Sequence, residues 1–95
     1  MVIPKKETDY VFDLEDSTLS GLILFSKKVA KAIESVISCN RVGVTVIGLE
    51  VPHAHIHLIP ISSEKDMSFS NPKLQLDKKE FEDIAASIRE AFEQL

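Results

Sequence analysis

From position 53 onward, histidine alternates with apolar residues, and this pattern constrains the fold more than any other feature of the chain. The stretch reads His53-Ala54-His55-Ile56-His57-Leu58-Ile59. Because successive side chains of a β-strand point to opposite faces, the three histidines would share one face and the intervening apolar residues would face a hydrophobic layer. The pattern therefore predicts a strand over residues 53–61.

Two other segments have the apolar spacing of amphipathic helices. The first is predicted to begin near Asp16 and Ser17, which can cap free backbone N–H groups, and to end around residues 38–40. Its apolar stripe consists of Leu22, Phe25, Val29, Ala32, Ile33 and Val36. The second is predicted to follow Asp77, because Asp77 and Glu80 have the spacing of a capping box. We expect its stripe to pack against the sheet; it consists of Phe81, Ile84, Ala85, Ile88, Phe92 and Leu95.

The remaining segments complete an α+β domain. Residues 42–47 are rich in β-branched residues and alternate as a strand does, and Gly48 and Pro52 bracket the connection that follows. Residues 1–3 predict a short β segment, residues 5–13 a polar connection, and residues 62–76 a surface loop. Together these elements predict an α+β fold with a small antiparallel sheet and two main helices.

Length and charge limit the number of domains and the class of partner. Ninety-five residues leave room for a single domain spanning 1–95. A net charge of −4 without a Lys/Arg cluster disfavours a nucleic-acid polymer or a membrane as partner. No apolar run approaches the roughly 20 residues that cross a bilayer. Cys39, the single cysteine, cannot form an internal disulfide, so we expect a reducing, cytoplasmic location.

The histidine cluster is open to three interpretations. The first is a solvated strand face, although three histidines rarely fall at alternate positions by chance. The second is a zinc site, but residues two apart lie about 6.5–7 Å apart along a strand, which spreads the outer ligands too far without distortion. The third is phosphate chemistry, in which the central imidazole attacks phosphorus while its neighbours stabilise charge. The third interpretation fits the pattern best.

The motif resembles the signature of the histidine triad (HIT) family, in which three histidines alternate with apolar residues. Gly48 and Val51 stand where that family often has a Gly and a Val, and Pro60 follows the motif as in many members. The predicted helix, strand and triad strand also occur in the family's order. The resemblance implies a HIT-like fold and a nucleotide-binding hydrolase or transferase, usually a homodimer.

The resemblance also implies roles for the three histidines. His55 would be the nucleophile at the α-phosphorus of a nucleotide conjugate and would form a nucleotidyl-histidine intermediate. His53 and His57 would donate hydrogen bonds to phosphate oxygens or to the leaving group. A neutral imidazole can attack with one nitrogen while a backbone carbonyl holds the proton of the other. This scheme requires no metal or other cofactor, because N–H donors meet the charge on the phosphoryl oxygens.

Two departures from the family pattern bear on the substrate and the assembly. Many members have Gln directly after the Gly that precedes the triad, whereas this chain has Leu49 and then Glu50, which leaves the substrate class open. Members usually also carry an additional N-terminal helix and hairpin, so we expect an N-terminally shortened domain. An exposed sheet edge is a template for association, and we therefore expect a homodimer or a segment swap.

The predicted function is hydrolysis or transfer at the α-phosphate of a purine nucleotide conjugate. Dinucleoside polyphosphates, nucleoside phosphoramidates and acyl-adenylates are all open as substrates. The first alternative is a nucleotide-binding module without turnover, and the second is a zinc-binding protein. Ser62 and Ser63 are expected to form a turn rather than a phosphate site, and Cys39 is expected to be a buried or partly buried side chain rather than a nucleophile.

Overall fold

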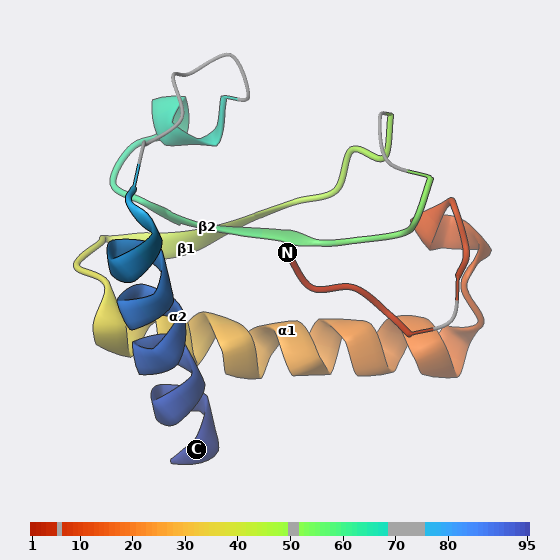
Figure 1. Ribbon diagram of the computed structural model, residues 1–95. Helices are drawn as coiled ribbons and strands as arrows, with labels where there is room; N and C mark the ends of the chain where they lie inside the picture. Colours follow the sequence, from red (N-terminus) through yellow and green to blue (C-terminus); the bar gives the residue numbers. More distant parts are fainter. Residues whose placement is uncertain (6, 50–51, 69–75) are drawn as a thin grey trace.

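Two helices and a two-stranded antiparallel sheet make up most of the fold, which confirms the predicted α+β class. The computed structural model describes residues 1–5, 7–49, 52–68 and 76–95. In chain order the elements are the 3-10 helix η1 (Val11–Asp13), α1 (Asp16–Val36), β1 (Arg41–Thr45), β2 (His57–Ile61), the 3-10 helix η2 (Glu64–Met67) and α2 (Lys78–Glu93). Figure 1 shows α1 running along one side of the strand pair, with α2 lying across α1. Over the described residues, no helix combines the length and the hydropathy that a membrane span needs.

β1 and β2 pair in antiparallel register, with Thr45 opposite His57 at one end of the sheet. The strand predicted at 42–47 is confirmed, although both of its ends lie one or two residues earlier. Its β-branched residues suit a pleated, half-buried surface. After the strand, Gly48 adopts a φ of 72°, a left-handed conformation that glycine reaches without steric cost.

The strand predicted at 53–61 is right only from His57 onward, where regular pairing with β1 begins. Because β1 ends at Thr45, the residues before His57 have no partner on that strand. A residue from the start of the chain pairs with them instead. Val2 and Ile56 form an antiparallel bridge with N–O distances of 2.8 and 2.9 Å, so the predicted β segment at 1–3 contributes one bridge to the fold.

α1 covers the core with one face. It begins at Asp16, as predicted, but its N-cap residue is Glu15 and no side chain caps it, so the predicted cap by Asp16 or Ser17 is wrong. Its buried residues are Leu22, Ser26, Ala32 and Ile33. Phe25 and Val36 belong to the predicted stripe but lie at the margin of this face and remain exposed.

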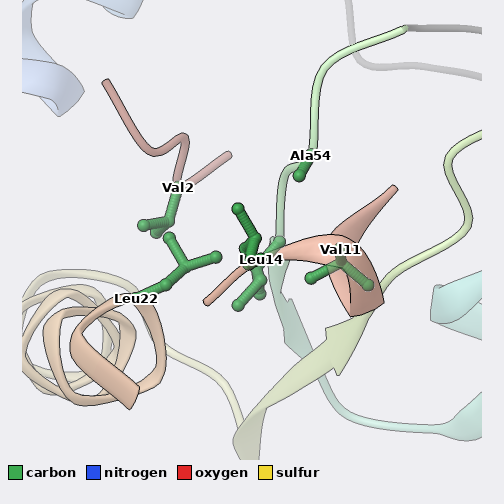
Figure 2. Close-up of a cluster of buried hydrophobic side chains, with 6 residues drawn as sticks. Val2, Val11, Leu14, Leu22 and Ala54 are labelled. Atoms are coloured by element: carbon green, nitrogen blue, oxygen red, sulfur yellow. The ribbon is translucent and has the colours of Figure 1, made fainter. Parts of the chain in front are cut away.

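The hydrophobic core joins the start of the chain to α1 and to residues 53–57, which carry the three histidines and are called the histidine segment below. It consists of Val2, Val11, Leu14, Leu22, Ala54 and Ile56 (Figure 2). Ile56 is the most deeply buried of these, with 1% of its surface exposed, and Leu58 packs against the same cluster. The predicted alternation is therefore confirmed on its apolar side, because Ala54, Ile56 and Leu58 all face the core.

α2 begins where the capping pattern predicts, but it packs differently. The Asp77 carboxylate accepts a hydrogen bond from the backbone N–H of Glu80 at 2.8 Å. The predicted packing of α2 on the sheet is wrong: its main contact is with α1, where Phe92 meets Phe25 at a ring-centroid distance of 5.4 Å. α1 already occupies the core side of the strands, so no residue of α2 is buried and Phe81 is 66% exposed.

The cap at Asp77 predicts a pH-dependent contribution to stability. The N–H of Glu80 donates to the Asp77 carboxylate and holds its pKa below the usual value. Ionised Asp77 therefore stabilises the folded chain above the unfolded pKa, and this stability is lost as the pH falls through the lower, folded pKa. We expect Asp77→Ala to melt a few degrees lower than the wild type at neutral pH, and this difference to shrink below about pH 4.

Asp77→Asn is the matched control for this experiment. Asparagine caps helices about as well as aspartate, so this variant should melt close to the wild type at neutral pH. It lacks the carboxylate and should also lack the acid-dependent loss. Melting followed by circular dichroism at several pH values measures all three proteins. Equal melting temperatures for wild type and Asp77→Ala at neutral pH would contradict the assigned cap.

Candidate active site

His55 and His57 face each other at the start of β2. Their Nε2 atoms lie 3.0 Å apart, and their rings meet edge to face with centroids 4.7 Å apart and an interplanar angle of 82°. Ile56, which lies between them in the chain, packs its side chain in the core cluster. The imidazoles on either side of it contact each other instead. The structure therefore brings two of the three predicted site residues together.

The carbonyl oxygen of His53 determines where the proton of His55 lies. This oxygen is 2.8 Å from His55 Nδ1, and because a carbonyl can only accept, Nδ1 carries the proton. In the neutral ring Nε2 then holds a lone pair, and the 3.0 Å contact makes the Nε2–H of His57 the donor to it. This is the protonation state that a nucleophilic imidazole needs.

His53 has a different partner from the other two histidines. Its Nε2–H donates to the carbonyl oxygen of Pro4 at 2.9 Å. A phosphate contact by His53 stays a prediction. The zinc interpretation finds no support, because the described part of the chain contains no group of three His, Cys, Asp or Glu side chains able to hold a metal ion.

His55 is buried, with 5% of its surface exposed. It stands between Ala54, which is 3% exposed, and Ile56, which is 1% exposed, so the core fixes the backbone on both sides of it. Both ring nitrogens nevertheless have polar partners. A ligand that binds Nε2 of His55 must displace the contact between this nitrogen and His57.

Backbone groups near the start of the chain also support the segment that carries His53 and Ala54, and no residue pattern marks these groups in the sequence. The carbonyl oxygen of Pro4 accepts from His53, and that of Thr8 accepts from the backbone N–H of Ala54 at 2.6 Å. The first of these contacts joins residues 49 positions apart. Both acceptors are backbone atoms that every residue carries, so no residue type marks them in a sequence.

The serine pair lies at the opposite end of β2 from His57. The backbone N–H groups of Ser62 and Ser63 donate to the Asp66 carboxylate at 2.9 and 3.1 Å. These bonds cap η2 and hold the pKa of Asp66 below its usual value. The predicted turn is therefore confirmed, and it includes a 3-10 helix within the predicted loop at 62–76. Residues 69–75 of that loop lie outside the described residues.

Cys39 carries a free thiol and is partly buried, in line with the expectation. Leu49, which stands where many HIT proteins have Gln, is 88% exposed. Glu50 and Val51 lie outside the described residues.

Comparison with known proteins points to one family. The family model described as "HIT domain" matches residues 1–64. The bis(5'-nucleosyl)-tetraphosphatase (asymmetrical) of Schizosaccharomyces pombe is 33% identical over 89 residues, covering 84% of this chain and 47% of that protein. An uncharacterized HIT-like protein of Borreliella burgdorferi is 25% identical, covering 93% of this chain and 69% of that protein. The chain thus spans about half the length of the first of these relatives.

Solved structures share the fold. A histidine triad protein from Bradyrhizobium japonicum aligns with a TM-score of 0.77 at 20% identity, covering 95% of this chain and 72% of that one. A hypothetical histidine triad nucleotide-binding protein from Sulfolobus tokodaii aligns with a TM-score of 0.76 at 26% identity, covering 98% of this chain and 68% of that one. The predicted HIT-like architecture is therefore confirmed.

Proposed function

Because the chain belongs to the HIT family, we propose that it is a nucleotide hydrolase or nucleotidyltransferase that acts through His55. One observation carries the proposal: the hydrogen bonds around His55 leave a lone pair on its Nε2 and place the Nε2–H of His57 beside it. A nucleophile next to a proton donor is the arrangement that displacement at a phosphorus atom requires.

In the first proposed step, the lone pair on His55 Nε2 attacks the α-phosphorus of the nucleotide conjugate. A bond forms between Nε2 and phosphorus, and the bond from phosphorus to the leaving group breaks. His57 acts here in its imidazolium form: its Nε2–H, released from its contact with His55, passes a proton to the departing atom, and His57 becomes a neutral imidazole. The products of this step are the protonated leaving group and a nucleotidyl-histidine on His55.

In the second proposed step, water or another acceptor attacks the same phosphorus. The bond between phosphorus and His55 Nε2 breaks, and its electron pair returns to the ring. His57, deprotonated by the first step, takes the proton of the attacking water, which restores the starting state of both rings. Throughout, the carbonyl oxygen of His53 stabilises the protonated Nδ1 of His55.

We propose a purine dinucleoside polyphosphate as the first substrate to test. The support is the Schizosaccharomyces pombe relative, whose name denotes action on a bis(5'-nucleosyl) tetraphosphate. The purine base is part of the proposal alone. Nucleoside phosphoramidates and acyl-adenylates offer the same α-phosphorus with different leaving groups, so they belong in the same experiment.

The proposed function is tested by measuring the release of AMP from diadenosine tetraphosphate and from an adenosine phosphoramidate. Chromatography quantifies the AMP. We expect multiple turnovers per protein molecule with at least one of the two compounds. Absence of AMP release from both, with a protein that is folded by circular dichroism, would count against the enzyme.

One observation favours a second candidate, a nucleotide-binding module without turnover. His55 is only 5% exposed and its Nε2 is engaged by His57, so the nucleophile is closed to solvent in this arrangement. Saturable binding of AMP by calorimetry, without AMP release from either compound, would favour this candidate.

We also propose that the chain forms a homodimer. Within the described residues β1 pairs only with β2, so one edge of β1 is open. Val44 on this strand is 60% exposed. An open strand edge that carries an exposed apolar side chain favours association. Gel filtration with light scattering should give twice the chain mass at micromolar concentration, and a stable monomer would contradict the proposal.

A further inference from the structure

Two backbone carbonyls near the start of the chain hold the segment that carries the first two histidines. Val2 accepts from the N–H of Ile56 at 2.9 Å and donates to the carbonyl of the same residue at 2.8 Å. The carbonyl of Thr8 accepts from the N–H of Ala54 at 2.6 Å. This segment precedes the regular β1–β2 ladder, so these N-terminal contacts, and not the sheet, support its backbone.

His53 links this N-terminal support to the proposed nucleophile. Its side chain donates from Nε2 to the carbonyl oxygen of Pro4 at 2.9 Å. Its own carbonyl oxygen accepts from His55 Nδ1 at 2.8 Å. Anchoring the His53 ring therefore also anchors the peptide whose oxygen sets the tautomer of His55.

We propose that His53 is a positioning residue: its bond to Pro4 holds its carbonyl oxygen where that oxygen keeps the proton of His55 on Nδ1. The catalytic consequence of this role rests on the proposed function, whereas the tautomer of His55 does not. In a neutral His53 ring with its proton on Nε2, Nδ1 carries a lone pair and cannot donate to a phosphate oxygen. His53 in this state thus acts through His55.

Two substitutions separate positioning from phosphate binding. His53→Gln keeps an amide N–H about where Nε2 lies, so it can still donate to Pro4. His53→Phe keeps the planar ring but removes the donor. We expect His53→Gln to retain kcat close to the wild type. We expect His53→Phe to lower kcat about 10–100-fold, the usual cost of losing an orienting partner, with little change in KM.

Imidazole nitrogen NMR provides a readout that needs no turnover. At about pH 8, where an ordinary imidazole is neutral, long-range proton–nitrogen spectra distinguish the two tautomers of each histidine. We expect the wild type to show His53 protonated on Nε2 and His55 protonated on Nδ1. We expect His55 to keep this tautomer in His53→Gln and to become a mixture of tautomers in His53→Phe.

Three results would overturn the proposal. The first is a wild-type spectrum with the opposite tautomer on either histidine, which needs no variant and therefore stands even if His53→Phe fails to fold. The second is an unchanged His55 tautomer in folded His53→Phe. The third is a raised KM with equal losses of kcat in both variants, which would assign His53 to phosphate binding. If the wild type releases no AMP, the proposed function fails while the spectra still decide the role of His53.

Discussion

Replacement of His55 by alanine is expected to lower the rate of AMP release at least about 10⁴-fold, the scale seen when a covalent nucleophile is removed. Alanine removes the lone pair that we propose attacks phosphorus, so the proposed bond between Nε2 and the nucleotide could not form. Any rate that remains must come from direct attack of water. Initial rates with diadenosine tetraphosphate, measured for both proteins at equal concentration, give the ratio.

A direct search for the intermediate strengthens this experiment. Wild-type protein mixed with substrate and quenched in denaturant at neutral pH should gain the mass of one nucleotidyl group, and His55→Ala should not. Lys31→Ala serves as the matched surface control, because Lys31 is exposed and forms a surface ion pair with Glu34 at 3.8 Å. It should keep the wild-type rate. Full activity in His55→Ala would show that the nucleophile is assigned wrongly.

Ile56→Ala is expected to destabilise the fold by about 2–5 kcal/mol, a large share of the roughly 5–15 kcal/mol that stabilises a typical domain. Ile56 is 1% exposed and lies in the cluster that joins the start of the chain to α1. Truncation leaves a cavity between these parts. Urea denaturation followed by circular dichroism measures the change in the unfolding free energy.

Two milder variants provide comparisons for the loss of unfolding free energy in Ile56→Ala. Ile56→Val removes one methylene from the same site and should cost about 0.5–1.5 kcal/mol. Leu24→Ala removes a side chain that is 62% exposed, and it should change the unfolding free energy by less than about 0.5 kcal/mol. If Ile56→Ala proves no more costly than Leu24→Ala, the core is not centred on Ile56.

Local patterns predict much of this fold. The alternation around the histidines places Ala54 and Ile56 in the core, as the structure confirms. The capping pattern at Asp77 correctly marks the start of α2. Both signals depend on neighbours in the sequence, one through the period of a strand and the other through backbone groups three residues away. Such local features can therefore be predicted from a single sequence.

The features that could not be predicted depend on residues far apart in the chain. β2 begins at His57 rather than at position 53 because β1 ends opposite it, and a strand's own residues do not reveal where its partner stops. α2 packs on α1 because the core side of the sheet is already occupied. The bond from His53 to Pro4 joins a side chain to a backbone oxygen 49 positions away. The residue type of neither group indicates that the other is its partner.

On the proposed function, the bridge between Val2 and Ile56 would tie the reactivity of His55 to local unfolding of the N-terminal residues. If Val2 detaches while β1 and β2 stay paired, the amide hydrogen of Ile56 becomes free to exchange with solvent, although the molecule as a whole stays folded. If His55 acts as proposed, the fraction of molecules with a competent site depends on this local opening equilibrium. A change that loosens the bridge would then slow the proposed reaction without moving the midpoint of global denaturation.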